Sequence, residues 1–63
     1  MSFVKYITNY RLEKAKELLI NTNMKIVDIY KKVGFGNSSY FTLMFKNHFG
    51  INPSQFKEKG GDL

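Results

Sequence analysis

Apolar residues recur at helical spacing along the first third of the chain. Residues 2–21 contain no glycine or proline and are rich in leucine, lysine, glutamate and alanine, which favour helix. One stripe at this spacing consists of Val4, Ile7, Leu12, Ala15, Leu18 and Leu19. Ser2 is the expected N-cap, and the polar residues 21–23 are the expected end. The pattern predicts one long helix over 2–21 whose stripe packs against a core.

A second apolar group occupies the opposite side of the first half of this helix. It consists of Phe3, Tyr6 and Tyr10, here called the aromatic face. A chain this short has little material with which to cover two sides of one helix. The aromatic face is therefore either part of an unusually wide core stripe or a surface that packs against a partner outside this chain.

Residues 25–33 repeat the helical pattern over a shorter distance. The positions i, i+3, i+4 and i+7 hold Ile26, Ile29, Tyr30 and Val33. Gly34 follows directly, and glycine commonly follows a helix end because it accepts the left-handed backbone conformation. The pattern predicts a short helix followed by a tight turn over 34–37.

The third predicted helix spans 38–49 and has two different sides. Asn37 or Ser38 can cap its start, and Gly50 stops it. Its expected core side contains Phe41, Met44, Phe45 and His48. Its other side contains Ser38, Ser39, Thr42, Leu43 and Lys46. We expect this helix to bury one side and to present small and polar groups on the other.

Asn52 and Pro53 form a helix start signal, which predicts a last short helix over 53–59. Residues 60–63 show no periodicity and are predicted to form a flexible tail. About four helices without a strand pattern indicate an all-α fold. Two short helices joined by a tight glycine-containing turn, at 25–49, indicate a homeodomain-like helix-turn-helix bundle.

The outer side of the 38–49 helix carries the predicted chemistry. In a helix-turn-helix, the second helix enters the major groove of DNA. Short hydroxyl groups and cations can reach base edges and phosphates, and no carboxylate stands among them here. The predicted base-facing residues are Ser38, Ser39, Thr42 and Leu43. For Ser38, helix capping is an equal alternative.

Four cationic side chains are predicted to contact DNA phosphates, namely Lys46, Arg11, Lys31 and Lys32. Lys46 lies one turn beyond Thr42 on the same helix. A solvated helix face explains Lys31 and Lys32 equally well. Arg11 interrupts the apolar stripe of the first helix, so it either pairs with a carboxylate or reaches along the helix to a phosphate.

Composition narrows the possible functions. The 63 residues include ten Lys and Arg against five Asp and Glu, and the net charge of +5 favours a polyanionic partner. The absence of cysteine fits a cytoplasmic setting, and the longest apolar run, 18–20, is far too short to span a membrane. The single histidine, His48, has no second ligand beside it. We expect no metal, no cofactor and no enzymatic activity.

The two short helices and their flanks resemble the AraC/XylS family of transcription regulators. The likeness rests on Arg11-Leu12-x-x-Ala15-x-x-Leu18-Leu19, Ile26-x-x-Ile29, Val33-Gly34-Phe35, Ser39-Tyr40-Phe41-x-x-x-Phe45-Lys46-x-x-Phe49-Gly50 and Pro53-Ser54-x-Phe56. It spans nearly the whole chain. It is specific because it joins two helices, their turn and the terminal element in the same order.

The resemblance implies a function and a domain plan. Members of this bacterial family bind double-stranded DNA sequence-specifically through two helix-turn-helix lobes joined by a long helix. By this likeness 2–21 is the linker helix, 25–49 is the second lobe and 38–49 is its recognition helix. A first lobe and an N-terminal sensor or receiver domain would then lie outside this chain, and the first lobe would cover the aromatic face.

Two positions depart from the family pattern. Tyr30 stands where the family usually has a small residue such as alanine, so the helix crossing must adjust. Leu43 stands where arginine is frequent, so bidentate reading of guanine is not available there. Leu43 either contacts a thymine methyl or leaves this lobe a weak reader. A protein-interaction or dimerisation module that uses the aromatic face is the alternative function.

Overall fold

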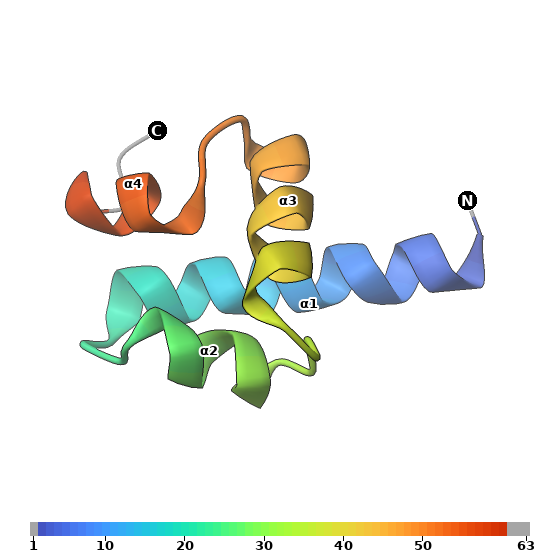
Figure 1. Ribbon diagram of the computed structural model, residues 1–63, viewed down its shortest axis with the longest axis horizontal. Helices are drawn as coiled ribbons and strands as arrows, with labels where there is room; N and C mark the ends of the chain where they lie inside the picture. Colours follow the sequence, from blue (N-terminus) through green and yellow to red (C-terminus); the bar gives the residue numbers. More distant parts are fainter. Residues whose placement is uncertain (1, 61–63) are drawn as a thin grey trace.

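Four helices make up the fold, which a computed structural model describes for residues 2–60. They are α1 (Phe3–Asn21), α2 (Ile26–Lys32), α3 (Ser38–Phe49) and α4 (Pro53–Glu58), and residues 2–60 contain no strand. α2 lies alongside the C-terminal half of α1, α3 crosses α1 steeply near its middle, and α4 returns to the C-terminal half of α1 (Figure 1). The all-α class predicted from the sequence is confirmed.

Side-chain caps set three of the four helix starts. The Ser2 hydroxyl accepts the Lys5 N–H at 3.1 Å. In the same way Asn37 Oδ1 accepts the Tyr40 N–H at 2.7 Å, and Asn52 Oδ1 accepts the Gln55 N–H at 2.8 Å. Asn37 is therefore the cap of α3, and Ser38 is its first helical residue. α2 and α4 are shorter than predicted because Lys25, Val33 and Lys59 are flanking cap residues.

Thr22 closes α1 and begins the turn to α2. Its hydroxyl donates to the Leu18 carbonyl at 2.7 Å and accepts the Met24 N–H at 3.2 Å. The ammonium group of Lys57 donates to the Met24 carbonyl at 2.9 Å. This last bond ties α4 to the turn between α1 and α2.

Aromatic rings from α3 and α4 form the centre of the core. Phe41, Phe45 and Phe56 are completely buried, and the ring centroid of Phe45 lies 5.7 Å from those of both other rings. The other helices contribute Leu12, Ala15, Leu19, Ile29 and Tyr30. The ring of Tyr30 stacks on Phe41 with their centroids 5.8 Å apart. Tyr30, which stands where the family usually has a small residue, thus packs inside the core.

The stripe predicted on α1 reaches the core only in the C-terminal half of the helix. Leu12, Ala15 and Leu19 are buried, whereas Val4 is 70% exposed and Ile7 is partly covered. α1 has 19 residues, and at 1.5 Å per residue it is about 28 Å long. The three shorter helices cover mainly its middle and its second half (Figure 1). The expectation that Val4 packs in the core is therefore wrong.

The aromatic face lies in the uncovered half of α1. Phe3 is 79% exposed, Tyr6 58% and Tyr10 55%. These rings do not belong to a wide core stripe, so that alternative is wrong. What remains is an apolar surface that residues 2–60 leave uncovered.

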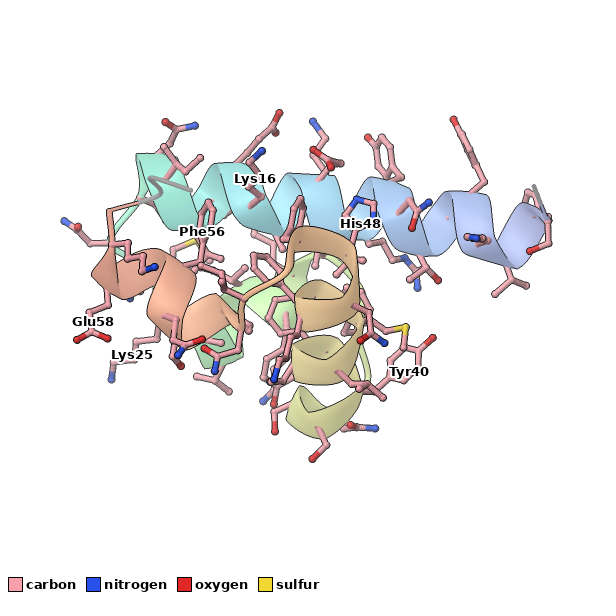
Figure 2. All side chains as sticks on the ribbon, turned by 90° about the horizontal axis from the view of Figure 1, so that it is seen from above. Lys16, Lys25, Tyr40, His48, Phe56 and Glu58 are labelled. Carbon is pink, nitrogen blue, oxygen red and sulfur yellow. The ribbon has the colours of Figure 1, made fainter. Side chains whose placement is uncertain are left out.

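His48 lies at the surface and not in the core. Its Nε2 is 3.1 Å from Glu13 Oε2, and its ring and that of Phe49 are edge-to-face with centroids 4.6 Å apart. Figure 2 shows His48 next to α1. At about 100° per residue His48 lies only about 20° around α3 from Phe41, so helical spacing puts it on the core side. It is exposed because it lies in the last turn of α3, beside Glu13 of α1. The prediction of a core histidine is wrong.

Two further expectations concern the chain ends and membranes. Of the predicted flexible tail, 60–63, only Gly60 is among the described residues, and 61–63 lie outside them. No helix within residues 2–60 is both long and apolar enough to cross a membrane.

Truncating Phe45 to alanine is expected to unfold the chain. Removing a fully buried ring costs about 3–5 kcal/mol, which equals the whole free energy of unfolding that a core of this size usually supplies. Leu43→Ala, on the same helix but 54% exposed, is the matched control and should change that free energy by less than about 0.5 kcal/mol. Urea unfolding followed by circular dichroism measures both. Equal effects would contradict this assignment of the core.

Candidate nucleic-acid interface

The exposed side of α3 brings the predicted base-facing residues together with one predicted phosphate contact. At about 100° per residue, the five fall within an arc of roughly 140°. This outer arc consists of Ser38, Ser39, Thr42, Leu43 and Lys46, and all five are exposed. Because α3 contains no aspartate or glutamate, the arc presents hydroxyl, apolar and cationic groups without a carboxylate.

The first turn of α3 is suited to an anionic ligand. The hydroxyl of Ser38 is not the cap, and within residues 2–60 it has no hydrogen-bond partner. The backbone N–H groups of Ser38 and Ser39 stand at the start of the helix, where no earlier turn accepts them. Such N–H groups, together with the helix dipole, attract phosphate oxygens.

A second exposed side of α3 faces the N-terminal half of α1 across a groove of about 450 Å³. From α3 the groove is lined by Tyr40, Met44, Asn47 and His48. Tyr40 lies on this side of the helix in Figure 2. Tyr40 and Asn47 were not among the site residues predicted from the sequence. Their spacing of seven residues places them on one side, but only the crossing of α3 over α1 shows what that side faces.

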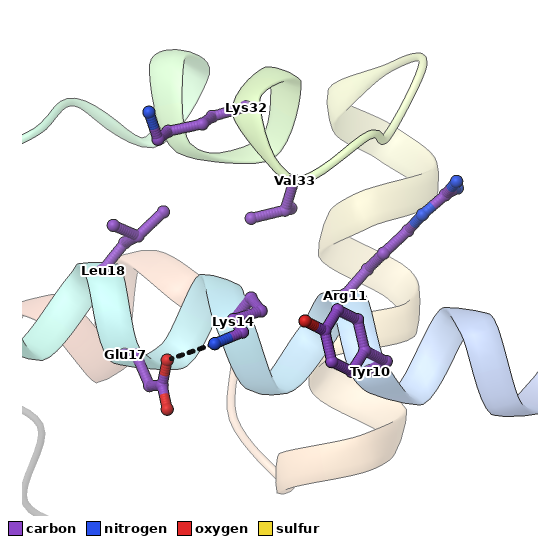
Figure 3. Close-up of a pocket in the computed structure, with 7 residues that line it drawn as sticks. All are labelled: Tyr10, Arg11, Lys14, Glu17, Leu18, Lys32 and Val33. Atoms are coloured by element: carbon purple, nitrogen blue, oxygen red, sulfur yellow. Dashed lines mark hydrogen bonds and ion pairs between the residues drawn. The ribbon is translucent and has the colours of Figure 1, made fainter.

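The predicted phosphate contacts come from three helices. Lys46 belongs to the outer arc, and Lys31 is exposed at the end of α2. Lys32 instead borders a hollow of about 440 Å³ between α1 and α2 (Figure 3). The other residues that line this hollow are Tyr10, Arg11, Lys14, Glu17, Leu18 and Val33. The structure thus brings Lys32 beside α1 and not beside α3.

Arg11 extends from α1 toward the turn between α2 and α3 (Figure 3). Its Nη1 donates to the backbone carbonyl of Gly34 at 3.3 Å. The ion pairs within residues 2–60 are those of Lys14 with Glu17 and of His48 with Glu13, so Arg11 has no carboxylate partner there. The predicted carboxylate pairing is therefore wrong, and the sequence did not anticipate a backbone partner.

Comparisons with known proteins agree with the residue pattern. A family described as "Helix-turn-helix domain" matches residues 1–59. The chain is 41% identical over 61 residues to the uncharacterized transcriptional regulatory protein YesN of Bacillus subtilis (strain 168), and 37% identical over 59 residues to the Msm operon regulatory protein of Streptococcus mutans serotype c. It is 40% identical over 58 residues to the bifunctional transcriptional activator/DNA repair enzyme AdaA of Bacillus subtilis (strain 168).

These relatives are much longer than the chain. The matches cover 94%, 94% and 92% of this chain but 17%, 21% and 28% of YesN, the Msm operon regulatory protein and AdaA, respectively. No solved structure matches. The chain therefore corresponds to a limited segment of each relative.

Asn37→Ala is expected to fray the first turn of α3. The substitution removes the bond to the Tyr40 N–H and costs about 1 kcal/mol of stability. Ser38→Ala is the matched control and should leave stability nearly unchanged, since Ser38 does not cap the helix. Thermal unfolding and amide hydrogen exchange at residues 39–41 report the effects. A larger loss for Ser38→Ala would show that the cap is assigned to the wrong residue.

Proposed function

Because the chain belongs to the AraC/XylS family of helix-turn-helix transcription regulators, we propose that it binds double-stranded DNA with α3 in the major groove. The observation that carries this proposal is the outer arc, an exposed surface without carboxylates on a helix whose opposite side is locked in the core. A rigid helix that presents small side chains can approach base edges closely.

The base-facing residues are Ser38, Ser39, Thr42 and Leu43. The hydroxyl groups of Ser39 and Thr42 can donate to or accept from base edges, and Leu43 and the Thr42 methyl group fit a thymine methyl. Since Leu43 stands where the family often has arginine, bidentate contact to guanine is not available from that position. We therefore expect a preference for thymine at the position that meets Leu43.

Phosphate contacts come from Lys46, Lys31 and Lys32, and from the N–H groups at the start of α3. Arg11 remains a predicted phosphate contact as well, because its guanidinium has five N–H donors and only one is used by Gly34. One recognition helix covers few base pairs, so the affinity of this chain depends mainly on these charges and falls steeply with salt.

The chain supplies the second lobe of a two-lobed DNA-binding domain in this proposal, and α1 is the linker helix. Two observations support it, namely the small fraction of each relative that the chain covers and the exposed aromatic face of α1. The first lobe would cover that face, and a sensor or receiver domain would precede it in a cytoplasmic regulator. The proposal assigns this chain no catalytic role and no cofactor.

Fluorescence titration of labelled duplex DNA at several salt concentrations tests the binding mode. With three or four phosphate contacts, the logarithm of the binding constant should fall with the logarithm of salt concentration with a slope of about −2.7 to −3.6. Lys46→Gln removes one phosphate contact and should make the magnitude of this slope smaller by about 0.9. Lys14→Gln removes the same charge from a lysine that already pairs with Glu17, and it should leave the slope close to that of the wild-type chain. Binding that does not weaken with salt would contradict the proposal.

The double substitution Tyr6→Lys, Tyr10→Lys tests the role of the aromatic face. In the full-length regulator it should weaken specific DNA binding at least about tenfold by undocking the first lobe, since charged groups there would be buried without partners. In the 63-residue chain it should change the free energy of unfolding by less than about 0.5 kcal/mol, because both rings are exposed.

Sedimentation of the 63-residue chain separates this role from dimerisation. If the aromatic face packs against the first lobe, the wild-type chain should sediment as a monomer. A wild-type dimer that the double substitution dissociates would favour the dimerisation alternative instead.

A further inference from the structure

We propose that Arg11 is a positioning residue for DNA binding, because its guanidinium fixes the turn between α2 and α3 and thereby the tilt of α3. The inference rests on the proposed function and adds a residue that acts through the protein backbone. It is separate from any phosphate contact that Arg11 makes.

The base of the Arg11 side chain is held by the core of the bundle. Leu12, next to it on α1, and Ala15, one turn further, are both buried. The backbone at Arg11 therefore cannot shift without disturbing these two contacts. From this fixed point the side chain extends to the turn between α2 and α3 (Figure 3).

Gly34 lets the guanidinium of Arg11 pack closely against the backbone, because it has no side chain and accepts a positive φ. Its φ of +104° is a conformation that side chains other than glycine rarely adopt. A Cβ atom added there would lie 3.0 Å from Arg11 Nε and 3.1 Å from Cζ. The guanidinium thus packs directly against the Gly34 backbone and also donates to its carbonyl. The slender chain of a lysine offers no such planar group.

The turn transmits this contact to α3. The N–H groups of Gly34 and Phe35 donate back to α2, to the Lys31 and Tyr30 carbonyls at 3.1 and 2.8 Å. The ring of Phe35 is buried against Phe41 of α3, with centroids 5.1 Å apart. A displaced turn would move Phe35, and Phe35 would move Phe41 and tilt α3.

Arg11→Lys is the decisive substitution because it keeps the positive charge and with it any phosphate contact. The expected result is a loss of DNA affinity of about tenfold with the fold intact by circular dichroism. Lys14→Arg, an equally conservative change one turn further along α1, is the matched control and should leave the affinity unchanged. Wild-type affinity of Arg11→Lys would overturn the inference.

Amide chemical shifts of the free chain provide a readout that does not depend on DNA. Arg11→Lys should shift the amides of Gly34 and Phe35 and of the first turn of α3, whereas Lys14→Arg should not. Unchanged shifts at these positions would overturn the inference even if affinity fell. Failure of the wild-type chain to bind duplex DNA would refute the proposed function, while the shifts would still decide whether Arg11 holds the turn.

Discussion

The complete burial of Phe41 and Phe45 sets the direction of α3, and every proposed base contact depends on that direction. The two rings lie four residues apart, so they hold one side of the helix over a full turn. Their neighbours come from the other helices, with Tyr30 against Phe41 and Phe56 against Phe45. The five residues of the outer arc are all exposed. Its orientation is therefore a product of the core behind it.

Because the side chains of the outer arc are short, base contacts tolerate little change in the orientation of α3. Serine and threonine reach only a few ångströms from the backbone, so they cannot compensate for a tilted helix as a long arginine can. The contacts that hold the start of α3 have a functional meaning for this reason. Asn37 fixes the first turn, and Arg11 and Phe35 fix the chain that leads into it.

The local elements could be predicted from the sequence because each helix carries its own start and stop signals. The apolar spacing in 26–33 and the capped start at Asn52 needed no knowledge of the rest of the fold. Spacing also identified the outer arc, since the side of α3 opposite its phenylalanines must face outward.

The failures share one physical cause, which is that spacing shows which side of a helix is apolar but not what lies against it. Val4 continues the stripe of α1, yet no helix reaches it. His48 has the spacing of a core residue, yet it lies in the last turn of α3 beside Glu13 of another helix and is exposed there. Arg11 donates to the backbone carbonyl of Gly34. Every residue has such a carbonyl, so the sequence does not indicate which one a side chain will bond.

The uneven cover of α1 gives one continuous helix two different stabilities. Its second half can open only when the whole bundle unfolds, because Leu12, Ala15 and Leu19 are part of the core. Its first turn, residues 3–6, is exposed and is held by little more than the Ser2 cap and the intrinsic tendency of its residues to form helix, which is marginal for so short a segment. Local fraying there costs little, and a partner that docks on it must supply the free energy of ordering it. Along α1 the free energy of opening thus rises from a small value at the first turn to the free energy of unfolding of the whole domain.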